Sequence, residues 1–410
     1  MATSRQTGKP VKITEIEFHP LRLVVAGASS EGTDADPRDQ IGASAEAMAA
    51  QRYTAPETGV VRIRTDAGIE GLGDGATLPH YLGHGIGSMA DWMGRFRSVL
   101  VGTDPLNIAG VHRRMEAVAG IAAPGCRPAQ AAIDMAIHDL AGKFYDCPVY
   151  EVLGGAYRTE FDLQTQMHGH TPEQLLDVCH HYIGQGYKAL KIKIGGQLRR
   201  EGFSKAKVDS DLAKVSAVAD QVPGNIQIDV DANQALGSSK IAVNFFEQVI
   251  RSKLHANMSV EQPLHHLDLI GHAFVRRALP LPMVLDESVT SPVAMMQIAR
   301  LGAADRIVLK PNRVGGLWPA RKIIAICEAN GIGVSLDTMP FTALGNTMLC
   351  HLAATIRTAY PLDAEGHTFF EDSPFRGGLE LRDGRAHLSR ASGFGVEVDE
   401  PSLADMSIAV

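Results

Sequence analysis

Two lysines near the middle of the chain are spaced so that their side chains can act together. They lie in the stretch Tyr187-Lys188-Ala189-Leu190-Lys191-Ile192-Lys193-Ile194. Side chains of a β-strand point alternately to opposite faces, so Lys191 and Lys193 share one face. An edge strand can carry lysines for another reason, because they discourage pairing with a second sheet. The pair is a candidate for acid/base chemistry only if other strands contribute to the same site.

Three further strand-like runs each end in a carboxylate. Asp231 follows Ile226–Val230, Glu261 follows Met258–Val260, and Asp286 follows Met283–Leu285, whereas the next strand ends in Lys310. A single acid at such a position can simply cap the following helix. Its recurrence on successive strands favours a shared site, where clustered carboxylates repel one another unless a cation lies among them. A donor set made of oxygen atoms alone suits Mg²⁺.

Two polar residues lie beside these acids. Asn233, in Asp231-Ala232-Asn233-Gln234, and Glu287, adjacent to Asp286, are interpreted as residues that orient the metal ligands rather than bind the metal.

The combination of lysines and a divalent cation predicts a specific kind of chemistry. A free lysine has a pKa of about 10.4, so its use as a base at neutral pH costs about 4 to 5 kcal/mol. A neighbouring ammonium and a divalent cation both lower that pKa. Mg²⁺ on a substrate carboxylate stabilises the enediolate that forms when the adjacent carbon loses a proton. Lysines on opposite faces could remove that proton and return one.

The overall composition is that of a globular protein that acts on small molecules. The chain has 410 residues, 45% of them hydrophobic, which is enough for a large core. A net charge of −7 and the lack of basic runs argue against a nucleic acid partner. The cysteines show no CxxC spacing, and no apolar run suggests a signal peptide or a membrane span. We expect a cytoplasmic protein, with no membrane partner.

The elements that must position these residues alternate between strands and helices after residue 145. This rhythm predicts an α/β fold with a parallel sheet, and units of roughly 30 residues suggest a closed barrel. We assign residues 146–380 to it. The strand candidates are Glu160–Met167, Ala189–Ile194, Ile226–Asp231, Met258–Glu261, Pro282–Asp286, Arg306–Lys310, Gly333–Asp337 and a weaker one near Arg357–Leu362.

The remaining parts of the chain are expected to cover the barrel. Alternating residues in Val11–Phe18 and Gly59–Arg64 predict an antiparallel meander, and helical periodicity follows from Ile108 to Phe144. Residues 1–145 therefore form an α+β domain, in which the segment 26–56 is interpreted as a lid loop. Residues 381–410 are expected to pack back on this domain.

Together these motifs resemble the enolase superfamily, and within it the muconate lactonizing enzyme subgroup of mandelate racemase/muconate lactonizing enzyme-like proteins. The resemblance covers nearly the whole chain. It is carried by Ala131-Ala132-Ile133-Asp134-Met135-Ala136, Lys191-Ile192-Lys193, Asp231-Ala232-Asn233-Gln234, Glu261-Gln262-Pro263, Asp286-Glu287-Ser288, and Lys310 before Gly315-Gly316.

The resemblance implies a modified (β/α)7β TIM barrel with an N-terminal capping domain and a magnesium-dependent enzyme. It places Mg²⁺ on Asp231, Glu261 and Asp286, and acid/base catalysis on Lys193 and Lys310. By the same resemblance, Lys191 assists Lys193 and contacts the substrate carboxylate. The mandelate racemase-like branch would carry a His–Asp pair at the sixth and seventh strand ends, where this chain has Lys310 and Asp337. That departure disfavours a mandelate-type activity.

The substrate is less well defined, because the subgroup includes racemases, epimerases, cycloisomerases and syn-dehydratases. Asp337, Asp363 and Glu365 could hold an ammonium or betaine nitrogen, or they could be solvated loop acids. We expect a racemase or epimerase of an amino-acid-derived carboxylate. The alternatives are a dehydratase of a hydroxy or sugar acid, a cycloisomerase, or a scaffold protein without activity. A homo-oligomer is also expected, since symmetric assemblies are common among enzymes.

Overall fold

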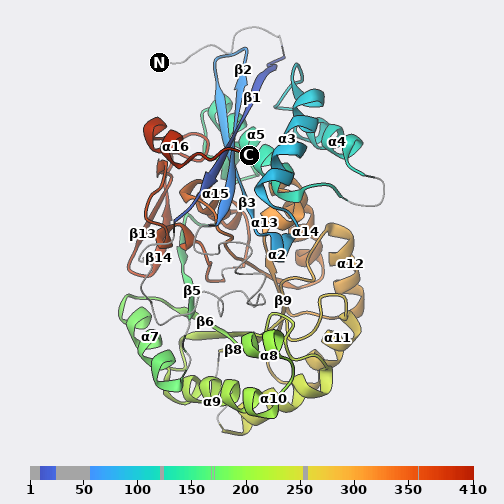
Figure 1. The fold of residues 1–410 in the computed structure, drawn as a ribbon, viewed down its shortest axis with the longest axis vertical. Coiled ribbons are helices and arrows are strands. Elements are labelled where there is room, and N and C mark those ends of the chain that lie inside the picture. Colours follow the sequence, from blue (N-terminus) through green and yellow to red (C-terminus); the bar gives the residue numbers. More distant parts are fainter. Residues whose placement is uncertain are drawn as a thin grey trace.

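The computed structural model describes residues 10–24, 56–120, 124–167, 169, 171–252, 257–358 and 360–410. A three-stranded antiparallel sheet with its helices lies above a barrel of parallel strands, which is covered on the outside by helices (Figure 1). The predicted α/β class, with an N-terminal cap on a barrel, is confirmed. The predicted lid loop, residues 26–56, lies outside the described residues except for Pro56.

The cap begins with the predicted meander. β1 (Ile13–Arg22) pairs antiparallel with β2 (Glu57–Thr65), and β2 pairs antiparallel with β3 (Glu70–Thr77). The helices that follow are α2 (Pro79–Leu82), α3 (Ile86–Leu100), α4 (Ile108–Val118), α5 (Arg127–Tyr145) and α6 (Val149–Val152). A cluster of buried apolar side chains from the meander and from α3, α4 and α5 forms the core of the cap.

A row of glycines brings α5 close to the meander. Gly71, Gly73 and Gly75 alternate along β3 and therefore share one face. A Cβ atom on each would lie 2.0, 1.9 and 2.5 Å from the backbone oxygens of Ala136, Ala132 and Pro128. Side chains at these positions would push the helix away. The period-two glycines thus allow α5, which is buried from Pro128 to Gly142, to lie directly on the sheet.

The barrel sheet contains seven parallel strands in chain order. They are β5 (Gln164–Met167), β6 (Ala189–Lys193), β7 (Gln227–Asp231), β8 (Met258–Glu261), β9 (Met283–Leu285), β10 (Arg306–Leu309) and β11 (Gly333–Leu336). The first predicted strand, Glu160–Met167, is divided, because β4 (Glu160–Asp162) pairs with a C-terminal strand instead of with the barrel. Since consecutive strands are neighbours throughout, the strand ends that carry the candidate residues all lie at one mouth.

One residue closes the barrel between β11 and β5. Leu362 forms a parallel bridge with Leu163. Its backbone N–H donates to Asp162 at 2.9 Å, its carbonyl accepts from Gln164 at 2.8 Å, and the N–H of Asp363 donates to Leu336 at 3.2 Å. Among the described residues of the weak strand predicted near Arg357–Leu362, only the last, Leu362, forms a bridge, and it occupies the eighth position of the barrel.

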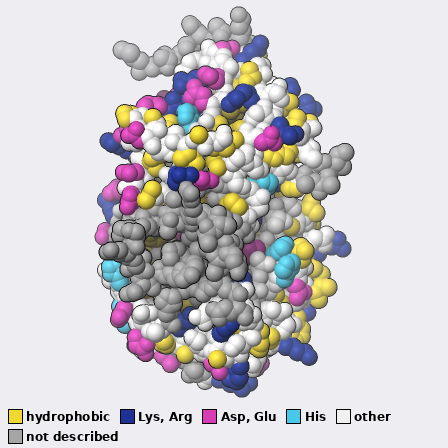
Figure 2. All heavy atoms as spheres, in the orientation of Figure 1, with side chains coloured by type: hydrophobic (Ala, Val, Ile, Leu, Met, Phe, Trp, Pro, Cys, Tyr) yellow, Lys and Arg dark blue, Asp and Glu magenta, His cyan; other side chains and the backbone are white. Residues whose placement is uncertain are grey.

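Helices cover the outside of the barrel. They are α7 (Pro172–Gly184), α8 (Gly196–Glu201), α9 (Lys205–Gln221), α10 (Ser239–Ser252), α11 (Leu269–Ala278), α12 (Pro292–Leu301), α13 (Pro311–Val314), α14 (Leu317–Ala329) and α15 (Ala343–Ala354), followed by the 3-10 helix η2 (Gly366–Phe369). On the face shown in Figure 2, Lys and Arg side chains are interspersed with Asp and Glu side chains.

The C-terminal part of the chain contacts both the barrel and the cap. Its elements are β12 (Phe375–Gly377), β13 (Leu379–Arg382), β14 (Arg385–Leu388), β15 (Val396–Val398) and α16 (Glu400–Met406). β14 pairs with β4, below the cap. Farther along, Glu400 accepts from Arg62 of β2 at 2.6 Å, and the N–H of Ile408 donates to Pro20 at 2.8 Å. The boundaries after residues 145 and 380 stay predictions.

A buried acid on α5 links the cap to the barrel. Asp134 accepts from the backbone N–H of Leu317 at 2.5 Å and of Trp318 at 3.4 Å, at the start of α14. The same carboxylate lies 2.5 Å from His112 of α4 and 3.4 Å from His138. Asp134 therefore supplies the N-terminal cap of a barrel helix from a position inside the other domain.

Candidate active site

The register of the barrel strands sets the positions of the site residues. Lys193, Asp231 and Glu261 are register partners on β6, β7 and β8, so they form one level at the mouth. Lys191, Asp229 and Ser259 form the level below by the same pairing. Both lysines reach carboxylates inside the barrel, which confirms that they share a face.

Lys193 and Lys310 lie on opposite sides of the mouth. Lys193 ends β6 and Lys310 follows β10, which are the second and sixth of eight positions when Leu362 is counted as the eighth. Asp231, Glu261 and Asp286 come from the three strands between them on one side. Asp337 and Asp363 come from the seventh and eighth positions on the other side. A small molecule at the centre would thus have one ammonium on each flank.

Lys191 is fully buried and is held by acids. Its Nζ lies 3.0 Å from Glu261 and 3.2 Å from Asp337, and its side chain has an exposure of 0%. Burial alone would lower the pKa of Lys191, but the charges of Asp337 and Glu261 outweigh it and raise that pKa well above its usual value. Burial raises the pKa of Glu261, with a further contribution from Asp231, although Lys191 opposes the shift. Lys191 is therefore a fixed positive charge in this arrangement.

Lys193 has a different environment, nearer the solvent. Its Nζ lies 2.5 Å from Asp231, and its side chain is 12% exposed. The other oxygen of Asp231 accepts from the backbone N–H of Asn233 at 2.8 Å. Both oxygens of this acid are thus engaged by neighbouring residues.

Lys310 makes the corresponding contacts on the opposite flank. Its Nζ lies 2.9 Å from Asp286 and 3.1 Å from Asp337. Burial alone would lower the pKa of Lys310, but the charges of Asp286 and Asp337 raise it well above its usual value. Asp337 bridges Lys191 and Lys310, and their two charges hold its pKa well below the usual range in spite of burial. The acid that ends β11 therefore joins two of the three lysines.

Sequence reasoning missed two residues that contact Asp286. Arg313 donates from Nη1 to the Asp286 carboxylate at 2.7 Å, and the hydroxyl of Tyr81 donates to it at 3.0 Å. Arg313 lies on the short helix α13, three residues after Lys310, and a basic residue this close to a strand-end lysine is the signal that could have revealed it. Tyr81 lies on α2 of the cap, so no pattern at the barrel strand ends could have revealed it. Its ring lies 5.2 Å from the Lys310 Nζ.

The acids at the mouth fit a divalent metal ion. Oxygen atoms of Glu261, Asp286 and Asp337, all buried, lie within 4.8 Å of one another. Glu287 also carries a buried oxygen, Oε2, that has no hydrogen-bond partner among the described residues. Burial, together with the charges of Asp286 and Asp231, raises the pKa of Glu287 to about 7. A donor set made of carboxylate oxygens alone is suited to a hard divalent cation.

The acids that cluster differ by one member from those predicted. Asp337 takes the place of Asp231, whose carboxylate is turned to Lys193 and to the backbone of Asn233. Asn233 also donates from its side chain to Glu287 at 3.2 Å. The two residues predicted to orient the metal ligands are thus in contact with each other beside Asp231 and Asp286. Their roles, and that of Asp231 as a ligand, stay predictions.

Two further acids line the far side of the mouth. Asp363 accepts from Gln166 Nε2 at 2.8 Å and shares a hydrogen bond with Asp337. Burial and the charge of Asp337 raise the pKa of Asp363 well above its usual value. Glu365 accepts from the Tyr187 hydroxyl, and burial raises its pKa as well. These acids are buried, so they are not the solvated loop acids of the alternative interpretation.

Comparison with known proteins agrees with this arrangement. Residues 174–402 match the sequence model of the enolase C-terminal domain-like family, and residues 38–154 match that of the mandelate racemase/muconate lactonizing enzyme N-terminal domain. The chain belongs to the enolase superfamily. Within it, this is a mandelate racemase/muconate lactonizing enzyme-like protein, and it is an enzyme of the isomerase or lyase type.

Relatives of this superfamily member include isomerases and lyases. It is 28% identical over 357 residues to N-succinyl-L-Arg/Lys racemase of Bacillus cereus, covering 85% of this chain and 90% of the relative. The crystal structure of N-succinyl Arg/Lys racemase from Bacillus cereus matches with a TM-score of 0.82 at 27% identity, over 97% of this chain and 98% of that one. The chain is also 27% identical to cis-3-hydroxy-L-proline dehydratase of Roseibium aggregatum, over 82% of this chain and 87% of the relative.

No helix among the described residues of this enolase-superfamily chain has the length and apolarity needed to cross a lipid bilayer.

Proposed function

We propose that this protein is a Mg²⁺-dependent racemase or epimerase that acts on the α-carbon of an amino-acid-derived carboxylate with a cationic nitrogen. The observation that carries the proposal is the buried acid pair Asp363 and Glu365, placed across the mouth from the candidate metal ligands. Glu365 Oε1 is buried and has no hydrogen-bond partner in the described part of the chain. An ammonium or betaine group would supply the missing positive charge.

The lysines on the two flanks supply the acid and the base. Lys193 removes the α-proton from one face of the substrate, and Lys310 returns a proton to the opposite face. In the reverse direction their roles are exchanged. Lys191, which is buried between Glu261 and Asp337, does not move a proton; its charge orients the substrate carboxylate and stabilises the negative charge that develops there.

Asp231, Glu261 and Asp286, at the carboxyl ends of three adjacent strands, would hold the magnesium ion. Asp337, whose carboxylate lies close to those of Glu261 and Asp286, would keep its contacts with Lys191 and Lys310. When bound, Mg²⁺ supplies a Lewis acid that stabilises charge on the substrate carboxylate. The carboxylates that pair with Lys193 and Lys310 are among these ligands. Since ligation would withdraw their charge from the two lysines, the carboxylates would no longer favour the protonated amines so strongly.

The acids of the eighth position orient the other end of the substrate. Asp363 and Glu365 are two residues apart, and both carboxyls have raised pKa values because of burial. A cationic nitrogen between them would favour their charged forms and would be favoured in return. The N-terminal ammonium of a dipeptide and the quaternary nitrogen of a betaine both fit this description.

Solvent exchange tests the proposal directly. The protein is incubated with Mg²⁺ in D₂O with a panel of dipeptides, N-acylated amino acids, proline-type betaines and hydroxy acids. We expect deuterium at the α-carbon, with inversion of configuration, for substrates that carry a cationic nitrogen. Removal of divalent ions with EDTA should stop the exchange, and added Mg²⁺ should restore it. Nuclear magnetic resonance and mass spectrometry measure the label.

The opposite result would support the alternative reactions. Formation of a 2-keto acid from a hydroxy acid, detected as a semicarbazone, would show that the protein is a dehydratase and not a racemase. Ring closure of an unsaturated diacid would show that it is a cycloisomerase. Exchange in every panel member regardless of charge would contradict the role given to Asp363 and Glu365.

Tyr81→Phe tests the contribution of the cap to the same site. The variant keeps the ring beside Lys310 but loses the hydroxyl that bonds Asp286 and accepts from Arg313 at 2.8 Å. A hydrogen bond to a charged group contributes about 1.5–3 kcal/mol, so we expect kcat/KM to fall roughly tenfold or more. Tyr157→Phe, at a side chain that is 64% exposed, is the matched control. Equal kcat/KM in both variants would show that the Tyr81 hydroxyl does not contribute to the reaction.

A further inference from the structure

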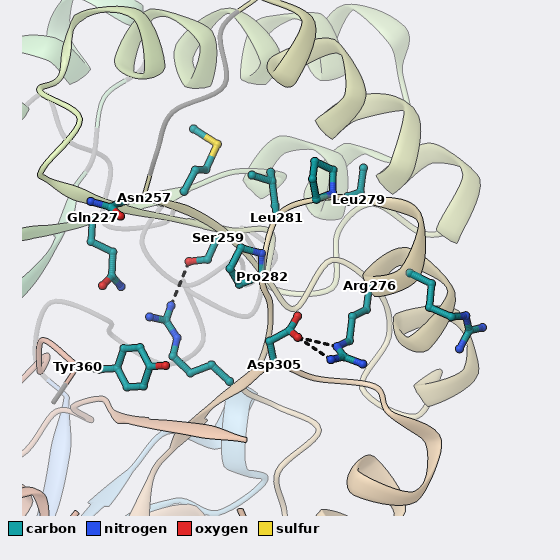
Figure 3. Close-up of a pocket in the computed structure, with 13 residues that line it drawn as sticks. Gln227, Asn257, Ser259, Arg276, Leu279, Leu281, Pro282, Asp305 and Tyr360 are labelled. Carbon is teal, nitrogen blue, oxygen red and sulfur yellow. Dashed lines mark hydrogen bonds and ion pairs between the residues drawn. The ribbon is translucent and has the colours of Figure 1, made fainter. Parts of the chain in front are cut away.

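A cavity of about 650 Å³ lies at the end of the barrel opposite the candidate active site. It is lined by residues near the starts of several barrel strands and by the turn that leads into β9. Tyr360 lies toward one end of this cavity, whereas Arg276 and Asp305 form an ion pair toward the other end (Figure 3). The two ends therefore have separate sets of contacts.

Arg306 lines this cavity and reaches an acid inside the barrel. It is 6% exposed, and its Nη2 donates to Asp229 and to the hydroxyl of Ser259, both at 3.0 Å. Its guanidinium lies 5.0 Å from the ring centroid of Tyr360. β10, which begins with Arg306, is three strands away from β7, which carries Asp229. The side chain of Arg306 therefore extends across the floor of the barrel.

Both oxygens of the Asp229 carboxylate are engaged at this level. Oδ2 accepts from Arg306, and Oδ1 accepts from the Ser259 hydroxyl at 2.7 Å. Asp229 is 1% exposed, so bulk water would not replace a contact that is lost. The acid is thus fully occupied by the two residues beside it.

Lys191 is a second cation within reach of Asp229. The two residues are register partners on β6 and β7. Because neighbouring strands lie about 4.8 Å apart, their side chains could pair directly. The Lys191 Nζ instead lies 3.0 Å from Glu261 and 3.2 Å from Asp337, and no ion pair with Asp229 exists within the described residues. Arg306 and Ser259 occupy the acid that would otherwise compete for this ammonium.

We propose that Arg306 is a positioning residue for the candidate active site. By holding Asp229 at the floor of the barrel, it leaves the Lys191 ammonium directed toward the mouth, where Lys191 meets the substrate carboxylate. The reason is electrostatic, because an unpaired carboxylate in a poorly solvated interior strongly attracts a neighbouring ammonium. The contact with substrate rests on the function proposed above, whereas the position of Lys191 does not.

Arg306→Gln tests the proposal, because it leaves Asp229 without its cation. A crystal structure of the variant should show the Lys191 Nζ about 3 Å from Asp229, a hydrogen-bond distance, and moved away from Asp337. With the substrates that the exchange experiment identifies, kcat/KM should fall about tenfold, as expected for the loss of one hydrogen bond to a charged group.

A second substitution separates this role from a merely structural one. Asp229→Asn, added to Arg306→Gln, removes the competing charge and leaves no unpaired buried ion. Lys191 should return to its position beside Asp337, and most of the lost kcat/KM should be recovered. If Arg306 only filled space, the second substitution would not repair the first.

Arg276→Gln is the matched control, because it removes an arginine from the other end of the same cavity. It should leave both kcat/KM and the position of Lys191 unchanged. Ser259→Ala serves if Arg306→Gln does not fold, since it frees one oxygen of Asp229 without removing a charge. It should move Lys191 in the same direction, with a smaller loss of kcat/KM.

Two results would overturn the proposal. One is a Lys191 that stays between Glu261 and Asp337 in every folded variant. The other is a loss of kcat/KM in Arg306→Gln that Asp229→Asn does not restore. If no substrate exchanges its α-proton, the proposed reaction fails, but the position of Lys191 in the variant crystals still decides whether Arg306 has this role.

Discussion

Lys193→Met and Lys310→Met are each expected to abolish proton exchange from one enantiomer of the substrate and to leave exchange from the other. Each variant should lose exchange of the α-proton from one enantiomer of the substrate while the other enantiomer still exchanges its proton without inversion. The reason is that Lys193 and Lys310 lie on opposite flanks of the mouth, so each serves one face. Loss of a general acid or base typically costs 10²–10⁴-fold, and racemisation should fall by roughly 10³-fold in both variants.

Proton nuclear magnetic resonance in D₂O, starting separately from each enantiomer, measures this division. Lys205→Met is the control, because Lys205 is 85% exposed on α9 and pairs only with Asp209 among the described residues. Circular dichroism should show that all three variants are folded. Exchange of both enantiomers at the original rate in either active-site variant would refute the assignment of that lysine as a proton carrier.

Asp134→Asn is expected to give the largest loss of stability. The substitution keeps the size of the side chain but removes the charge that pairs with His138 and His112 and caps α14. Breaking one side of a buried charged network costs about 3–5 kcal/mol, so we expect a fall in the free energy of unfolding of roughly 3 kcal/mol. The catalytic residues are not touched, so kcat of the folded variant should change little.

The loss should depend on pH in a defined way. Burial alone would raise the pKa of Asp134, but His138 and His112 lower it below its usual value. Burial alone would lower the pKa of His138, but Asp134 raises it above its usual value. The acid therefore stabilises the fold above about pH 4, and this contribution disappears as the pH falls through the lowered pKa. The histidine stabilises it below about pH 6.5, and this contribution disappears as the pH rises through the raised pKa.

Urea denaturation between pH 4 and 9 measures this dependence. The difference between the original protein and Asp134→Asn should be greatest from about pH 4 to 6.5 and should shrink above that range. Asp91→Asn, which removes an exposed acid on α3, is the control and should lie within about 0.5 kcal/mol of the original protein. A difference that is constant with pH would show that His138 carries no charge in the pair.

The parts of the fold that follow from local patterns could be predicted from the sequence. Alternation placed Lys191 and Lys193 on one face, and strand-terminal acids identified the mouth of the barrel. The eighth strand is the weakest prediction, and among the described residues of that segment only Leu362 forms a bridge. Its pairing is determined by two neighbouring strands and not by the local sequence. Residues 26–55 lie outside the described part of the chain, so the role of the segment 26–56 as a lid stays a prediction.

Residues that depend on the meeting of distant segments were harder to predict. Tyr81 reaches Asp286 only because the cap packs over the barrel, and nothing near Tyr81 in sequence signals that contact. Asp337 is a possible substrate-binding residue by its position at a strand end, and in the structure its carboxylate bridges Lys191 and Lys310. The position of Asp337 at the end of a strand could be predicted from the sequence. Its partners could not, because they depend on which cationic side chains the other strands place beside this buried acid.

The single-residue closure at Leu362 connects substrate binding to the integrity of the barrel. Three backbone hydrogen bonds between described residues hold this seam, and Asp363 and Glu365 follow Leu362 in the chain. A seam with so few bonds is the place where amide hydrogen exchange should reveal local opening at a lower free energy than elsewhere in the sheet. A cation held by Asp363 and Glu365 would therefore also stabilise the seam, and it should slow amide hydrogen exchange at Gln164 and Leu362. Binding of substrate to the residues proposed to select it would thus also stabilise the closed barrel.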